Sequence, residues 1–195
     1  MRKIVAGLFI SLDGVVEAPQ NWHFPYWTDE MGAIVQGQID ASDTLLMGRG
    51  TYDEFVQFWP TAGSDVELAD HMNGVEKIVV SNTLKNPTWQ NTTVIGGDIA
   101  ERLRELKRMS GRKNIGMSGS AGLIRWLINN DLLDELNLLV HPIVVGSGKR
   151  LFTDDSDRQP LTLADSRTLK TGVVSLVYTP ATDEATGESG GHAAP

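Results

Sequence analysis

Eight short apolar runs, rich in β-branched residues and bounded by Gly, Asn, Asp or Pro, recur along the chain. They predict strands, because they are too short for most helices and their composition favours an extended backbone. The first run is apolar at nearly every position, which is typical of a strand covered on both faces. The predicted strands are Lys3–Ile10, Thr44–Met47, Lys77–Ser81, Thr92–Ile95, Asn114–Met117, Leu136–Val145, Leu161–Thr168 and Val173–Tyr178.

Four stretches between these strands carry helical signals. Thr28 is a good N-cap for the first of them, and Asp98 with Glu101 three residues later forms a capping-box pattern before the third. The fourth has apolar residues at helical spacing. The predicted helices are Asp29–Ile39, Thr51–Phe58, Ile99–Met109 and Ala121–Asn130.

The order of these elements predicts the fold class. Strands and helices alternate up to about residue 130, and strands then follow one another. We therefore expect an α/β domain over residues 1–180, with a mixed, mostly parallel central sheet, flanking helices and antiparallel C-terminal edge strands. Residues 181–195 lack large apolar side chains and predict a disordered tail.

Composition excludes several classes of protein. The 195 residues include no cysteine, which excludes disulfides, Cys-based zinc sites and thiol nucleophiles. The net charge of −8 argues against a nucleic-acid partner but not against a small anionic ligand. No apolar run reaches the roughly 18 residues of a membrane span, and the first apolar run lacks a signal-peptide cleavage pattern. We expect a cytoplasmic protein with no membrane partner.

Two strand-to-helix junctions are candidate phosphate sites, because helix N-termini present free N–H groups to anions. The first contains Gly48, Arg49, Gly50 and Thr51, and the second contains Ser118, Gly119, Ser120, Ala121 and Gly122. Each also fits an ordinary turn, the first with a surface arginine and the second with close helix–strand packing. Two such junctions in one chain indicate a dinucleotide across the carboxyl ends of the strands.

Three other segments are weaker candidates. Asp13, before Gly14, is either a turn residue, which local sequence favours, or a carboxylate in the site. Gly146 and Ser147 border either a ligand or a solvated basic turn. Trp22 belongs to an aromatic cluster at residues 22–27, which forms either a stacking wall or a set of loop anchors. The four histidines lack metal-ligand spacing, so no metal site is predicted.

Taken together, these motifs resemble a known family. The segment Leu45–Tyr52 resembles the strand-to-helix signature of dihydrofolate reductases. Residues 11–14, 77–81, 119–122 and 142–148 resemble the reductase domain of the bifunctional riboflavin-biosynthesis enzyme, of the RibD C-terminal type, and more closely its stand-alone bacterial relatives. The resemblance covers about residues 2–179.

The resemblance implies a dihydrofolate-reductase-like fold, NADPH as the cofactor and a homodimer formed through the edge of the sheet. By the match, Gly48, Arg49 and Thr51 lie near the adenosine-end phosphates, Ser81 and Asn82 near the 2′-phosphate, and Ser118 to Gly122 at the pyrophosphate. Asp13 is the candidate catalytic residue near the nicotinamide. Trp22, Tyr52, Gly146 and Ser147 are the candidate substrate contacts. Val15 departs from the family, since a basic residue often stands there in riboflavin reductases.

The implied function is hydride transfer from NADPH to a small heterocyclic, carbonyl or imine substrate, as in 5-amino-6-(5-phosphoribosylamino)uracil reductase. Three alternatives remain open: dihydrofolate reductase proper, a non-catalytic NADPH- or nucleotide-binding protein, and a flavin-binding protein.

Overall fold

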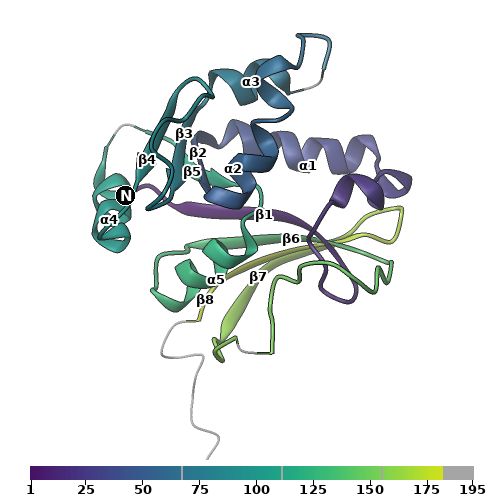
Figure 1. The fold of residues 1–195 in the computed structure, drawn as a ribbon. Coiled ribbons are helices and arrows are strands. Elements are labelled where there is room, and N and C mark those ends of the chain that lie inside the picture. Colours follow the sequence, from purple (N-terminus) through teal and green to yellow (C-terminus); the bar gives the residue numbers. More distant parts are fainter. Residues whose placement is uncertain (67, 111, 155, 182–195) are drawn as a thin grey trace, which may run out of the picture.

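A mixed β-sheet with helices on both faces forms the fold (Figure 1). The structure is a computed structural model, which describes residues 1–181 except 67, 111 and 155. The eight-stranded sheet has the order β4-β3-β2-β5-β1-β6-β8-β7. The strands are β1 Ile4–Ser11, β2 Ser42–Gly48, β3 Glu76–Val80, β4 Thr92–Ile95, β5 Asn114–Met117, β6 Glu135–His141, β7 Leu161–Thr168 and β8 Val174–Pro180.

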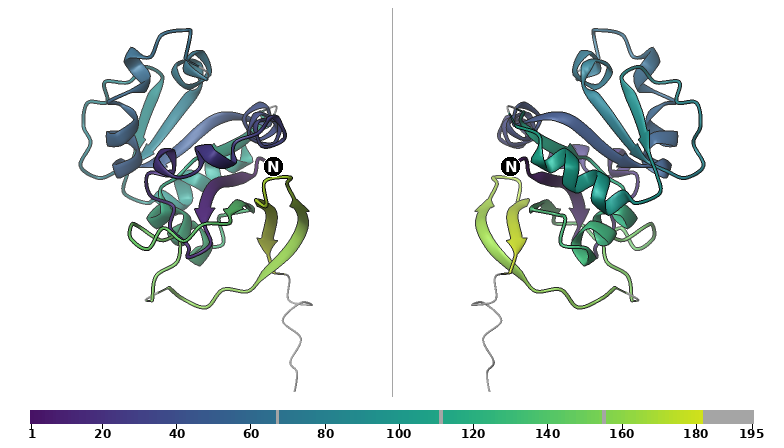
Figure 2. Two further views of the ribbon diagram at one scale, coloured as in Figure 1. Left: turned by 90° about the vertical axis from the view of Figure 1, so that its right-hand side faces the viewer. Right: turned by 90° about the vertical axis from the view of Figure 1, so that its left-hand side faces the viewer.

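Strands β1 to β6 are parallel, and the β7–β8 hairpin adds antiparallel strands at one edge. This confirms the predicted fold class, with its mostly parallel sheet and antiparallel C-terminal edge. The β7–β8 hairpin and the long segment that leads to it stand at one side of the molecule (Figure 2).

Five α-helices occur in the described residues: α1 Asp29–Asp40, α2 Arg49–Phe55, α3 Ala69–Gly74, α4 Ile99–Arg108 and α5 Ala121–Asn129. The predicted N-caps are present, since Thr28 accepts from the Met31 N–H and Asp98 from the Glu101 N–H. The short helix α3 was not predicted. The buried Lys77 ammonium donates to the carbonyl of Met72 in the last turn of α3 (2.8 Å) and to that of Val75, which follows the helix (2.7 Å).

Two predicted boundaries were wrong. The predicted strand Leu136–Val145 leaves the sheet after His141, because Pro142 has no N–H for the ladder and the Val145 N–H binds Asp13 instead. Helix α2 begins at Arg49 and ends at Phe55, so it lies earlier than the predicted Thr51–Phe58. The predicted tail, apart from Ala181, lies outside the described residues.

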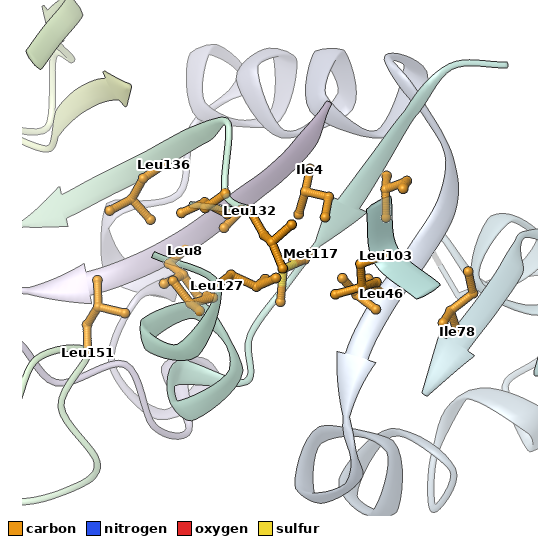
Figure 3. Packing of buried hydrophobic residues seen from close by; sticks show 14 of the residues in the cluster. Ile4, Leu8, Leu46, Ile78, Leu103, Met117, Leu127, Leu132, Leu136 and Leu151 are labelled. Carbon is orange, nitrogen blue, oxygen red and sulfur yellow. The ribbon is translucent and has the colours of Figure 1, made fainter. Parts of the chain in front are cut away.

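The core lies on both faces of the sheet. The largest cluster packs α4 and α5 against one face, with Leu103 and Leu127 over Ile4, Leu8 and Leu46 (Figure 3). On the other face, one cluster lies under α2 and α3 around Met72 and Trp89, and a separate one lies under α1 around Met31 and Leu139. The separation of these two clusters leaves room between α1 and α3. None of the helices in the described part of the chain has the length and apolar character that crossing a bilayer requires.

Candidate active site

A cleft of about 1300 Å³ lies between α1 and the α2–α3 segment, over β1, β5 and β2. Val5, Gly7 and Phe9 of β1 and Gly116 of β5 line its floor, and it extends to the loops that follow these strands. It thus reaches the carboxyl ends of the parallel strands, which is where ligands bind in open α/β sheets.

Ser120 joins the two predicted phosphate turns at this edge. Its hydroxyl accepts a hydrogen bond from the Gly48 N–H (2.7 Å) and donates one to Thr51 Oγ1 (2.6 Å). Helix α2, which follows β2, lies on one face of the sheet, and helix α5, which follows β5, lies on the other. Because β2 and β5 are neighbours in the sheet, the boundary between them is a topological switch point. The structure therefore brings together two turns that the sequence separates by about 70 residues.

The backbone around Ser120 leaves space for a bound group. Gly119 has a φ of 111° and Ser120 a φ of 64°, a left-handed pair that turns the chain sharply into α5. A Cβ at Gly50 would meet no atom within 4 Å, so this cleft-lining position is open. Successive N–H groups in such a turn, followed by a helix start, form an anion-binding concavity.

Basic side chains gather beside this turn. Arg125, one turn into α5, donates to the carbonyls of Arg150 and Leu151, and Arg150 donates to the Asp13 carbonyl at 2.9 Å. Lys149 pairs with Glu17 at 2.9 Å and approaches Glu54 at 3.9 Å. Glu17 raises the pKa of Lys149 through a hydrogen bond and its charge, and Lys149 lowers the pKa of Glu17.

The other predicted cofactor residues lie at the same edge but outside the cleft lining. Arg49 pairs with Asp53 within α2 through two contacts of 2.7 Å. The Ser81 hydroxyl accepts from the Leu84 N–H (3.0 Å), and Asn82 accepts from the Gly97 N–H (3.0 Å). Exposed ion pairs such as Arg49–Asp53 are weak, so Arg49 can exchange its carboxylate for a phosphate.

Asp13, the candidate catalytic residue, lies in a network of hydrogen bonds just after β1. Its carboxylate accepts from the Ser11 hydroxyl (2.7 Å) and from the N–H groups of Val145 (3.0 Å) and Gly146 (2.9 Å). These hydrogen bonds hold the pKa of Asp13 well below its usual range, whereas proton donation requires a raised pKa. Asp13 stays ionised and ties the loop after β1 to the segment after β6.

The aromatic segment divides between the two predicted roles. Phe24 and Trp27 line the cleft and are exposed, as a stacking wall requires. Trp22 is instead buried, donates to the Glu17 carbonyl (3.1 Å) and lies edge-on to His141. It anchors the loop and does not face the cleft.

The remaining candidate substrate contacts also lie away from the cleft lining. Tyr52 is buried in the cluster under α2 and α3, where its hydroxyl accepts from the N–H groups of Thr88 and Trp89. The Gly146 N–H is bound by Asp13, and Ser147 follows it on the exposed turn. None of these three residues therefore lines the cleft in the described structure.

Two polar side chains over the cleft floor were not predicted from the sequence, Gln38 at the end of α1 and Ser42 at the start of β2. Gly7, a lone glycine within an apolar strand, was a usable signal, because such a glycine often marks close approach of another group. Within the described residues, no cluster of three or more histidines and carboxylates could hold a metal ion.

The chain is similar to known proteins over nearly its whole length. The RibD C-terminal domain model matches residues 2–175. The uncharacterized protein YyaP of Bacillus subtilis (strain 168) is 33% identical over 180 residues, covering 91% of this chain and 94% of that protein.

Two solved structures share the fold. A putative riboflavin biosynthesis protein from Shewanella sp. PV-4 has a TM-score of 0.71 at 19% identity, covering 93% of this chain and 100% of that one. Dihydrofolate reductase from Enterococcus faecalis, complexed with NADP(H), has a TM-score of 0.59 at 14% identity, covering 92% and 97%. The fold is that of dihydrofolate reductase, and the chain belongs to the RibD C-terminal domain family.

Proposed function

We propose that this protein is an NADPH-dependent reductase that transfers a hydride to the carbon of a C=O or C=N bond in a small heterocyclic or carbonyl substrate. The observation that carries the proposal is the Ser120 link, which joins two small-residue turns beside an open cleft at the switch point of the sheet. Membership of a family named for a riboflavin-pathway reductase domain supports the same reaction class.

The residues at this edge fit a dinucleotide. Backbone N–H groups from Ser118 to Gly122 would hold the pyrophosphate, and Arg125 adds a positive charge beside it. Gly48 and Thr51, linked through Ser120, would lie at the adenosine-end phosphates. Arg49, Ser81 and Asn82 would select NADPH over NADH by contacting the 2′-phosphate.

NADPH supplies the hydride when bound, and the protein's own residues align the substrate and exclude water. Phe24 and Trp27 cover the cleft from the loop after β1. Because Asp13 is held ionised, the proton that completes the reduction comes from water at the cleft mouth rather than from this carboxyl group.

Dihydrofolate reductase proper is the weaker alternative. A carboxylate on the first helix would have to face the cleft, yet Glu30 pairs with Arg167 and accepts from the Lys170 N–H on the β7–β8 side. Asp29 is likewise absent from the cleft lining in the described structure.

Fluorescence titration of NADPH and NADH at fixed salt tests the proposal, with the variant Gly50→Asp as its probe. Aspartate in the first turn of α2 favours the helix dipole, so folding is retained. It places a negative charge where the phosphates would lie, so the dissociation constant for NADPH should rise about tenfold or more.

Gly37→Asp is the matched control, because Gly37 is another open helical glycine but lies outside the cleft. If the Gly50→Asp variant bound NADPH with normal affinity, the assignment of the NADPH phosphates to this turn would be wrong. Binding of neither nucleotide to the unmodified protein would overturn the reductase proposal. NADPH binding without turnover on any of a panel of carbonyl and imine substrates would favour a non-catalytic nucleotide-binding protein.

A further inference from the structure

Two glycines in the floor of the cleft, Gly7 and Gly116, leave space that polar side chains from other elements occupy. A Cβ on Gly7 would lie within contact distance of the Gln38 amide, closest to its Oε1 atom. A Cβ on Gly116, in the neighbouring strand β5, would lie 2.9 Å from the Ser42 hydroxyl. Val5 pairs with Gly116, and Gly7 follows two residues later on the same face of β1, so both polar groups lie over one patch of the sheet.

These two polar groups are free to bind a ligand. Within the described part of the chain, neither the Gln38 amide nor the Ser42 hydroxyl forms a hydrogen bond, and both residues line the cleft. The neighbouring Gln36, by contrast, donates to Asp40 at 2.9 Å. An amide and a hydroxyl with unused hydrogen-bonding capacity on the floor of a cleft are the polar groups expected to orient a small molecule there.

The charge distribution of the cleft limits the chemical class of the ligand that can bind on its floor. Among the described residues, the charged ones that line it belong to the turns and helices at the carboxyl ends of the strands: Glu17, Glu54, Arg125, Lys149 and Arg150. The walls near the floor are apolar and include Val35, Ile39, Leu45, Phe55 and Met72.

His71 is the one titratable side chain that lines the cleft from α3, among the described residues. Burial lowers its pKa and the Lys77 ammonium lowers it further, while the Asp40 carboxylate acts in the opposite direction. His71 is therefore uncharged at neutral pH and, like the apolar walls, presents no charge to a ligand.

We infer that the floor binds the substrate by a neutral lactam edge, through Gln38 and Ser42, and that the substrate carries no phosphate group. A carboxamide offers one donor and one acceptor side by side, which matches the N–H and C=O of a cyclic amide. A phosphate on the floor would lack a cation, because Lys149 and Arg150 lie at the carboxyl ends of the strands and pair with Glu17 and Asp13. A protonated amino-pyrimidine edge would lack a carboxylate, so both groups would lose hydration without a partner.

The inference rests on the proposed function. Substrate, NADPH and a proton give the reduced substrate and NADP⁺: the hydride forms a C–H bond, and water supplies the proton to the oxygen or nitrogen. The substrate named here is a flat, unphosphorylated heterocycle with a carbonyl or imine carbon, which differs from a ribosyl-phosphate pyrimidine.

The test measures binding of matched ligands to the protein saturated with NADPH, by isothermal titration calorimetry. The first pair is 6,7-dimethyllumazine, which has lactam edges, and 2,4-diamino-6,7-dimethylpteridine, which has amino groups in their place. The second pair is uridine and uridine 5′-monophosphate. We expect the lumazine to bind more tightly than the diaminopteridine by about tenfold, and the phosphate to weaken binding of the nucleoside by about tenfold.

Gln38→Met should weaken lumazine binding about tenfold, since the methionine keeps the length of the side chain and removes its polar atoms. Gln38→Glu should invert the preference toward the diaminopteridine, because it supplies the carboxylate that a protonated amino edge requires. Gln36→Met is the control and should leave the lumazine affinity within about twofold, because the Gln36 amide is engaged by Asp40.

Failure of this inference and failure of the proposed function give different results. Suppose that NADPH binds, but the diaminopteridine binds as tightly as the lumazine, or uridine 5′-monophosphate binds as tightly as uridine. The inference is then wrong and the reductase proposal stands. The inference is also wrong, and the reductase proposal again stands, if both Gln38 variants bind the lumazine normally. If NADPH itself does not bind, the proposed function fails first, and the inference with it.

Discussion

Two buried histidines, His23 in the cleft lining and His141 beside it, make stability depend on pH at the scale of single residues. His23 stacks on Phe9 with 4.5 Å between ring centroids, and His141 lies perpendicular to His23 at 6.2 Å. His141 Nδ1 contacts the Leu139 carbonyl at 2.8 Å. His23 Nδ1 and His141 Nε2 are buried without a hydrogen-bond partner in the described structure.

Burial lowers the pKa of both histidines, and the neighbouring His141 lowers that of His23 further. The unfolded chain therefore binds more protons than the folded protein as the pH falls through about 6.5. The free energy of unfolding should decrease as the pH falls below that value. His141→Phe should make this decrease shallower, which urea denaturation at pH 7 and pH 5 can measure. Equal losses of stability in the variant and the unmodified protein would contradict the assignment.

At the scale of elements, Asp13 holds two loops together across 132 residues of sequence. Asp13→Ala leaves the N–H groups of Val145 and Gly146 without their acceptor. We expect a lower thermal unfolding midpoint and faster amide hydrogen exchange over residues 143–150. Asp13→Asn keeps one acceptor oxygen and should lose less of both, and it should retain substrate turnover. If Asp13→Asn abolished turnover while exchange stayed normal, Asp13 would be a catalytic residue rather than a positioning one.

The same bond shows which elements could be predicted from the sequence. Helices α1 and α4 were predicted well because their caps, Thr28 and Asp98, act within three residues of themselves. The end of β6 was placed too late because the competing acceptor for the Val145 N–H lies in another loop. Helix α3 is six residues long, and the Lys77 contacts at its C-terminus come from the following strand.

In the candidate site, too, the features set by local sequence could be predicted and those set by distant contacts could not. The turns at Gly48 and Ser118–Gly122 could be placed because a strand, small residues and a helix follow one another locally. Their connection through Ser120 joins distant segments and could not be predicted. Gln38 was missed because a polar residue on a helix indicates exposure by default, and only the fold shows that it lies over Gly7.

At the scale of the whole molecule, the order of the sheet leaves β7 as an edge strand. Nearly all of its side chains are exposed, including Leu163 with 49% of its surface accessible. An open edge with an exposed apolar residue favours pairing with another chain. The predicted homodimer would use this edge, whereas β7 does not line the cleft, which lies over the central strands β1, β2 and β5.

This arrangement separates assembly from ligand binding. Light scattering after size exclusion should give twice the 21.3 kDa chain mass for the unmodified protein. Leu163→Lys should shift it toward the monomer, because the lysine places a charge on the pairing edge. Met109→Lys is the control, since Met109 is also apolar and 44% exposed but lies at the end of α4. NADPH affinity should be the same in all three proteins, because neither Leu163 nor Met109 lines the cleft. A monomeric unmodified protein at micromolar concentration would show that the edge stays unpaired, and a loss of NADPH binding in Leu163→Lys would show that assembly supports the site.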